Sequence, residues 1–143
     1  MEMKIKCLRG TKPPFYATNG AAGLDLVAAI DKEMQLEPAK RVMVPTGIAV
    51  AIPEGYVGLV YARSGLSTRQ GITLTNCVGV IDSDYRGEIV CSLIHLGQEP
   101  YTIRPGDRIA QLVLTPAPQA ALHVVEVLPQ TERGEGGFGS TGK

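Results

Sequence analysis

The chain has 143 residues, of which 44% are hydrophobic and 20% charged, and its 14 basic residues balance 14 acidic ones. This composition excludes an intrinsically disordered chain, and the length fits a single domain with its own hydrophobic core. The zero net charge lacks the basic surplus of most nucleic-acid-binding domains, and no apolar run is long enough to span a membrane.

Short apolar segments alternate with turn-forming residues along the chain. Val and Ile dominate these segments, which favours strands, and 17 Gly and 10 Pro residues supply turns between them. In chain order, strands are expected over residues 4–8, 24–28, 41–44, 47–52, 56–62, 72–74, 79–81, 88–95, 101–103, 108–114 and 123–127. One helix is expected over residues 64–70, with Ser64 as its N-cap and Gly71 at its C-terminal end. The strand spacing predicts an all-β sandwich, jelly roll or barrel.

Two of the expected strands are apolar at nearly every position, over residues 58–61 and 89–94. A strand with one face in water would alternate apolar and polar residues. Both faces of these strands are therefore expected to be covered, either by a neighbouring subunit or by a thick two-sheet core.

The cysteines and histidines give no sign of a disulfide framework or a zinc site. Cys7, Cys77 and Cys91 are odd in number and lack CxxC spacing, while His95 and His123 have no second ligand at metal spacing. The N-terminal residues lack the apolar stretch of a signal peptide. We therefore expect a reduced protein of the cytoplasm, or of the nuclear or virus-infected cell interior, that binds neither nucleic acid nor membrane.

Three polar side chains stand within or directly after apolar strands. Asp82 follows the strand at 79–81 and could orient a water molecule, although ordinary hairpins also carry turn acids. Gln111 lies inside an apolar strand and needs hydrogen-bond partners, which are either structural or from a ligand. Asp25 stands between two leucines and allows the same two interpretations.

Two further segments have the groups that bind phosphate. Arg63, Ser64 and Gly65 join a strand to the expected helix, where a guanidinium, a hydroxyl and backbone amides suit an anion; the simpler interpretation is a helix cap with a surface arginine. The glycine-rich tail after Pro129 is either disordered or a lid that closes over a ligand.

Five segments taken in order resemble a known family: AGLDL, ARSGLS, GVIDSDYRGEI, GDRIAQLV and RGEGGFGSTG. They are similar to the five ordered motifs of the homotrimeric dUTP diphosphatase (dUTPase) family. The resemblance covers residues 22–142, and the hairpin and the tail are its most specific parts. One mild departure is Ala62, where family members often have proline before Arg-Ser-Gly.

The resemblance implies an all-β jelly-roll fold of the dUTPase type, with one short helix, as a single domain over residues 1–143. Residues 1–129 would form the jelly roll and residues 130–143 a flexible Gly-rich lid. A homotrimer with three shared active sites is implied, each site drawing on all three chains. The implied reaction hydrolyses dUTP to dUMP and pyrophosphate with Mg²⁺ as cofactor, which keeps uracil out of DNA and supplies dUMP for thymidylate synthesis.

Residue roles are implied in the same way. Asp82 resembles the catalytic acid that deprotonates the attacking water, and Asp25 resembles the residue that supports Mg²⁺ indirectly, through water. The positions that resemble substrate-binding residues are Arg63, Ser64, Gly65, Asn76, Gly79, Val80, Ile81, Asp82, Tyr85, Gln111, Arg133, Phe138, Gly139, Ser140 and Thr141. Of these, Asn76 and residues 79–85 would form the uracil pocket, and Phe138 would stack on the base.

The implied pocket has a physical account of its selectivity. Backbone groups paired to the edge of uracil would be left unpaired against cytosine. A tight hairpin leaves no room for the thymine methyl group, and Tyr85 beneath the sugar would clash with a ribose 2′-hydroxyl.

Two alternatives stay open. A dCTP deaminase-like enzyme of the same fold needs a carboxylate at the pyrimidine C4, commonly a glutamate in the hairpin, where this chain offers Tyr85. A non-enzymatic trimeric β module that binds a protein partner is the second; it would tolerate a cut before Arg133, whereas an enzyme would lose turnover.

Overall fold

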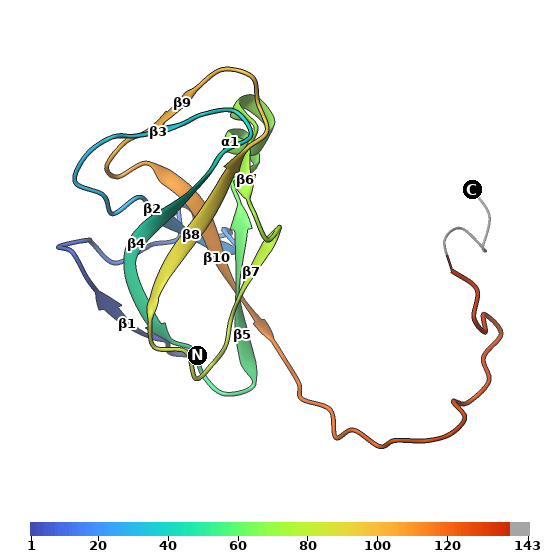
Figure 1. Cartoon of the computed structure of the whole chain (residues 1–143). Coiled ribbons are helices and arrows are strands. Elements are labelled where there is room, and N and C mark those ends of the chain that lie inside the picture. Colours follow the sequence, from blue (N-terminus) through green and yellow to red (C-terminus); the bar gives the residue numbers. More distant parts are fainter. Residues whose placement is uncertain (138–143) are drawn as a thin grey trace.

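The computed structural model describes residues 1–137, which form an all-β jelly-roll sandwich of two four-stranded antiparallel sheets (Figure 1). The first sheet has the order β1 (Lys4–Cys7), β4 (Arg41–Ala51), β8 (Glu88–His95) and β6 (Ile72–Leu74). The second has the order β2 (Gly23–Val27), β10 (Arg108–Pro116), β5 (Tyr56–Ala62) and β7 (Val78–Ile81). A two-stranded ribbon of β3 (Met34–Leu36) and β9 (Tyr101–Ile103) lies at one end.

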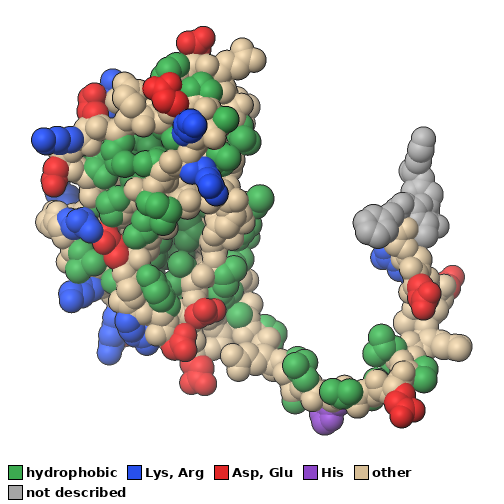
Figure 2. Space-filling view, in the orientation of Figure 1, with side chains coloured by type: hydrophobic (Ala, Val, Ile, Leu, Met, Phe, Trp, Pro, Cys, Tyr) green, Lys and Arg blue, Asp and Glu red, His purple; other side chains and the backbone are tan. Residues whose placement is uncertain are grey.

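The core lies between the two sheets, and the strands supply it with alternate residues. Along β8, Ile89, Cys91 and Leu93 are buried, whereas Val90 between them is 41% exposed. Met43 of β4 is 60% exposed on the same outer face, and Figure 2 shows apolar side chains gathered on the face that carries β4 and β8. Within a single chain, β8 is therefore fully covered on its inner face only, whereas Leu59 and Tyr61 on the outer face of β5 are half-buried.

A bulge in β4 explains why two expected strands are one. Residues 41–44 and 47–52 were expected to be separate because Pro45 and Gly47 interrupt the apolar pattern. In the register, β4 advances from Pro45 to Ala49 while β8 moves only from Val90 to Glu88. Gly47 has a φ of +69° at this irregularity, which glycine adopts without steric cost. The strand therefore bends and continues.

The helix α1 (Ser64–Gln70) lies where the sequence predicts it, but its start differs. Arg63 occupies the N-cap position and no side chain caps the first turn, so the assignment of Ser64 as N-cap is wrong. Gly71 ends the helix in the left-handed conformation, as expected. Within residues 1–137, no helix combines the length and apolar character required to cross a membrane.

The chain leaves the sandwich after β10 as an extended segment (Figure 1). The strand expected at 123–127 is wrong for the single chain, because residues 117–137 have no regular secondary structure. Val124 is fully exposed and Val127 is 79% exposed. A strand needs a neighbour for its backbone groups, and none of the strand pairs within the described residues includes this segment.

Candidate active site

One row of side chains crosses the outer face of the second sheet. Gln111 of β10 lies opposite Asp25 of β2 on one side and opposite Tyr61 of β5 on the other. Directly opposite residues point to the same face of a sheet. The adjacent residues Leu24 and Leu112 point to the other face and are buried in the core. The row therefore lies on the face that the core does not use.

Asp25 is held between two arginines. Its Oδ1 lies 3.2 Å from Nε of Arg63, and its Oδ2 accepts a hydrogen bond of 3.1 Å from Nη1 of Arg108. The Asp25 side chain is 12% exposed, against 29% for Arg63 and 50% for Arg108. Each guanidinium has five N–H donors, and these contacts use only a few of them. The cluster can therefore bind a further anion while Asp25 stays paired.

Gln111 is fixed by the end of the neighbouring strand. Its Nε2 donates a hydrogen bond of 3.1 Å to the carbonyl oxygen of Ala62. Ala62 pairs with Ala110, so β5 continues to this position. Gly23 leaves the space that Gln111 occupies: a Cβ atom on Gly23 would lie 2.8 Å from Oε1 of Gln111. The amide is thus held in place by its surroundings.

The turn from β5 into α1 adds groups that are free to bind. Ser64 and Gly65 are exposed, and the Ser64 hydroxyl does not cap the helix. A polar groove runs beside this turn, with Arg63, Arg69 and Arg108 among its lining residues. Three guanidinium groups along one groove attract a polyanion such as a phosphate chain.

The hairpin that carries Asp82 includes an open edge of the second sheet. β7 pairs with β5 on one side only, so the backbone N–H and C=O groups of alternate residues on its other side are available to a ligand. Asn76 closes the turn before β7, where its carbonyl oxygen accepts a hydrogen bond of 2.6 Å from the Val78 N–H. This edge can pair with a flat, hydrogen-bonding ring.

Asp82 and Tyr85 lie together just beyond β7. The Tyr85 N–H donates to the Asp82 carbonyl at 3.2 Å, which makes a turn, and the Tyr85 hydroxyl donates to the Glu88 carbonyl at 3.0 Å. Asp82 is exposed and lines a wide concavity together with Asp84 and Arg86. Its carboxylate is therefore accessible to water and ligand.

The structure thus separates the sequence-predicted site into two groups. Asp25, Arg63 and Gln111 form one cluster with the β5–α1 turn, whereas Asp82 lies on the far strand of the sheet. Between Asp25 and Asp82 are three strand spacings of about 4.8 Å and four residues of about 3.3 Å along the strands, or roughly 20 Å in all. One chain does not bring these two groups onto the same reacting atom.

The predicted tail residues are only partly described. Arg133 donates a hydrogen bond of 2.8 Å from Nε to the Gly136 carbonyl, within the segment that leaves the sandwich. Phe138, Gly139, Ser140 and Thr141 lie outside the described residues.

Comparison with known proteins identifies the family. A family model for dUTPase matches residues 11–142. The chain belongs to the dUTPase family.

Curated dUTPases match nearly the whole chain. The deoxyuridine 5′-triphosphate nucleotidohydrolase of Desulfitobacterium hafniense is 50% identical and covers 99% of this chain and 97% of that protein. The protein of the same name from Caulobacter vibrioides is 56% identical over 90% of this chain and 84% of its own length.

Solved dUTPase structures share the fold. The dUTPase of Staphylococcus bacteriophage 80alpha with dUpNHpp superposes with a TM-score of 0.90 at 31% identity, over 99% of both chains. A mutant dUTPase of phage phi11 of S. aureus, described with a structural Mg(II) ion, has a TM-score of 0.82 at 27% identity and covers 89% of this chain and 98% of its own.

Sequence reasoning about this dUTPase missed two side-chain contacts, one within the site and one outside it. Arg108 shares Asp25 with Arg63, and the GDRIAQLV motif contains it three residues before Gln111; a basic residue so close to a polar site position was the available signal. Glu88 contacts Arg9 from 79 residues away, and no local pattern marks such a pair.

Proposed function

We propose that this dUTPase hydrolyses dUTP to dUMP and pyrophosphate, and so keeps uracil out of DNA and supplies dUMP for thymidylate synthesis. The observation that carries the proposal is the division of the site: an open strand edge suited to a base lies on one part of the sheet, and an arginine-rich cluster suited to phosphates lies on another. The names of the relatives and the nucleotide analogue in the phage structure support the same substrate.

The division of the site leads to a homotrimer with three shared active sites. The hairpin of one copy would face the Asp25 cluster of a second copy, because roughly 20 Å separates them within a chain. Two features support such an assembly: the uncovered apolar face around Met43 and Val90, and the exposed apolar residues of the C-terminal segment. Both suit burial against neighbouring copies.

Asp82 is the proposed general base. Its exposed carboxylate would accept a proton from a water molecule and direct that water at the α-phosphorus of dUTP. The oxygen–phosphorus bond to the water forms as the bond to the bridging oxygen breaks, and pyrophosphate leaves in line. Reactions of this kind depend mainly on positioning and on stabilising negative charge.

The Asp25 cluster of a second copy would hold the phosphates. Arg63 would donate to the nonbridging oxygens and Ser64 to the oxygen that becomes negative as pyrophosphate leaves. Gln111, whose amide is held by the Ala62 carbonyl, would form a hydrogen bond to the phosphate chain or to a water molecule bound to it. Removing any one of these three side chains would weaken a contact that stabilises negative charge in the transition state.

The carboxylates of the site fit Mg²⁺ held through water. No group of three His, Cys, Asp or Glu side chains gathers within the part of the chain that the structure describes. Mg²⁺ commonly keeps several waters and uses one or two carboxylates together with substrate phosphates. A cluster of three protein ligands is therefore not required. Asp25 would accept hydrogen bonds from those waters. When bound, the ion neutralises charge on the three phosphates.

Uracil would be read by the open edge of β7 and by Asn76. The backbone groups of that edge have fixed donors and acceptors, which would be mispaired against cytosine. Tyr85 would lie beneath the sugar and exclude a 2′-hydroxyl. Discrimination by a mispaired buried group is much stronger than by a change of one methyl group.

The tail would close over the bound nucleotide as a lid. We propose that Arg133, Ser140 and Thr141 contact the γ-phosphate and that Phe138 stacks on uracil, which would exclude water and order the triphosphate. A protein cut before Arg133 should keep its melting temperature and lose most dUTP turnover. Unchanged turnover in the shortened protein would remove the lid and favour a binding module.

Pyrophosphate release is the direct test of the proposed function. The protein is incubated with dUTP, dCTP, dTTP and UTP, each with and without Mg²⁺. We expect rapid release from dUTP only, and only with the metal. Asp82→Asn should bind the nucleotide and lose most turnover. Comparable hydrolysis of all four nucleotides would refute the selectivity argument, and a fully active Asp82→Asn protein would remove Asp82 from the reaction.

A further inference from the structure

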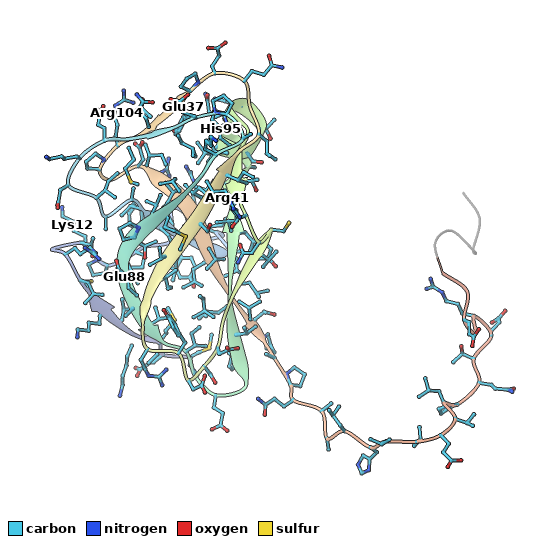
Figure 3. The ribbon with its side chains drawn as sticks, viewed as in Figure 1. Lys12, Glu37, Arg41, Glu88, His95 and Arg104 are labelled. Atoms are coloured by element: carbon cyan, nitrogen blue, oxygen red, sulfur yellow. The ribbon has the colours of Figure 1, made fainter. Side chains whose placement is uncertain are left out.

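Glu88, at the start of β8, joins three parts of the chain. Its carboxylate accepts three hydrogen-bond contacts from Nε and Nη2 of Arg9 at 3.0 to 3.3 Å, a two-pronged arrangement that engages both oxygens. The same carboxylate accepts the Gly47 N–H at 2.8 Å. Its carbonyl accepts the Tyr85 hydroxyl at 3.0 Å. Figure 3 labels Glu88 on the side of the sandwich where β1 runs beside β4.

The bulge in β4 makes the contact to Gly47 necessary. Where β4 advances four residues for two of β8, the regular ladder between the strands is interrupted. A backbone N–H without a partner is costly when it is shielded from water. The Glu88 carboxylate satisfies the Gly47 N–H, and its side chain is only 16% exposed.

The N-terminal loop is fastened to the same point. The Leu8 N–H and the Thr11 hydroxyl both donate to the Gly47 carbonyl, at 2.7 and 2.8 Å. Arg9 between them has a φ of +53°, a conformation that costs a non-glycine residue energy. The contacts on either side and the two-pronged pair with Glu88 hold it there.

The position of the Tyr85 ring depends on this point of the chain. The ring folds back over Gly87, where an added Cβ atom would overlap the Tyr85 hydroxyl. The hydroxyl then ends on the Glu88 carbonyl. Because Gly87 has no side chain, the ring can lie against it, and the Glu88 carbonyl holds the hydroxyl end. A shift of the Glu88 main chain would therefore move the acceptor that holds the Tyr85 ring.

The pKa values agree with a tight pair. The hydrogen bond from Arg9 and the contact with Gly47 lower the pKa of Glu88 against the opposing effect of burial, and Glu88 raises the pKa of Arg9. Both groups are therefore charged at neutral pH.

We propose that the Arg9–Glu88 pair is a positioning pair for sugar selectivity: it fixes the Glu88 main chain, and thereby the Tyr85 ring, so that the pocket accepts deoxyribose and rejects ribose. The inference rests on the proposed function, in which Tyr85 lies beneath the sugar. Neither Arg9 nor Glu88 touches the reacting atoms in this account, so their effect is on discrimination rather than on the chemical step.

The test compares kcat/KM for dUTP and UTP in Glu88→Gln and Arg9→Ala. Glu88→Gln keeps an acceptor for Gly47 but loses the ion pair with Arg9. Arg9→Ala leaves the carboxylate and its contact with Gly47 intact. We expect the dUTP/UTP ratio to fall by about tenfold in each, while kcat for dUTP changes by less than about threefold. Arg9→Lys keeps the charge without the two-pronged geometry and should recover part of the ratio.

Glu33→Gln is the matched control. It removes an exposed ion pair with Arg104, at 3.0 Å, away from the hairpin, and it should leave the ratio unchanged. Tyr85→Phe should lower the ratio on its own, and its effect should not add to that of Glu88→Gln, because the two act in series.

The outcomes separate this inference from the proposed function. If the wild-type protein does not discriminate dUTP from UTP, the proposed function fails. If it does, and Arg9→Ala folds with the wild-type ratio, the positioning pair is wrong and the proposed function stands. Equal losses of activity on both nucleotides, with a lowered melting temperature, would also refute the pair, because they would indicate a merely structural role.

Discussion

Two inactive variants should restore activity when they assemble together. Asp82→Asn lacks the proposed base and keeps the Asp25 cluster, whereas Arg63→Ala keeps Asp82 and lacks a phosphate ligand. In Arg63→Ala, Asp25 still pairs with Arg108, so the fold should survive. Because roughly 20 Å separates Asp82 from the cluster within a chain, we expect an intact site to require contributions from two copies.

The expected recovery follows from counting sites in a closed ring of three. A site is intact when the copy that gives the hairpin is Arg63→Ala and the copy that gives the cluster is Asp82→Asn. In an equal random mixture each condition holds with a chance of one half, so about one quarter of all sites should work. The two proteins are unfolded together, refolded at equal concentration and assayed for pyrophosphate release from dUTP.

Two controls decide the interpretation. Each variant refolded alone should stay inactive, and the two mixed without unfolding should gain activity only as fast as subunits exchange. Size-exclusion chromatography must show the same assembly for every sample. No recovery in properly assembled mixtures would place the whole site within one chain and refute the reasoning from the strand register.

Further outcomes can be measured on the same protein. Burial raises the pKa of Cys91 to about 12, so iodoacetamide should label the exposed Cys7 and Cys77 in the native protein and Cys91 only after unfolding, as read by mass spectrometry; rapid native labelling of all three would contradict the buried core. Gly23→Ala should displace Gln111, break its bond to the Ala62 carbonyl and lower kcat/KM about tenfold, a loss of about 1.4 kcal/mol, and wild-type kinetics would show that Gln111 does not act. The folded-state pKa of Glu88 is lowered, so its stabilising effect should be complete above the ordinary Glu pKa of about 4.3 and disappear as pH falls further. The melting temperatures of wild type and Glu88→Gln should therefore differ at pH 7 and converge in acid, and a constant difference would contradict the pairing.

The strands were largely predictable because their signal is local. Runs of Val and Ile between turn formers predict ten of the segments that form strands or parts of strands in the structure, from Lys4–Cys7 to Arg108–Pro116. β3 was missed because its sequence, MQL, lacks the β-branched residues that mark the equally short β6 (ITL) and β9 (YTI). The split of β4 was wrong because proline and glycine also occur at bulges. The expectation at 123–127 failed because apolar alternation does not reveal whether a partner strand belongs to the same chain.

The site was predictable as a set of residues but not as an arrangement. Asp25 and Arg108 are 83 positions apart, and only the order β2-β10-β5 brings them together. The resemblance implies that Asp82 and Arg63 contribute to one site shared between chains, and the register separates the two residues within one chain. Long-range pairing depends on strand order and register, which single segments do not encode.

The open edge of β7 also bears on how the protein avoids aggregation. An unpaired strand edge is a template for other chains and a route to aggregation. β7 has only four residues, contains a glycine and runs directly into Asp82 and, two residues later, Asp84, which are features that blunt such pairing. A strand of this length would suffice to read one base, as proposed, and is too short to nucleate a fibre, so the same short edge would also protect the protein when no nucleotide is bound.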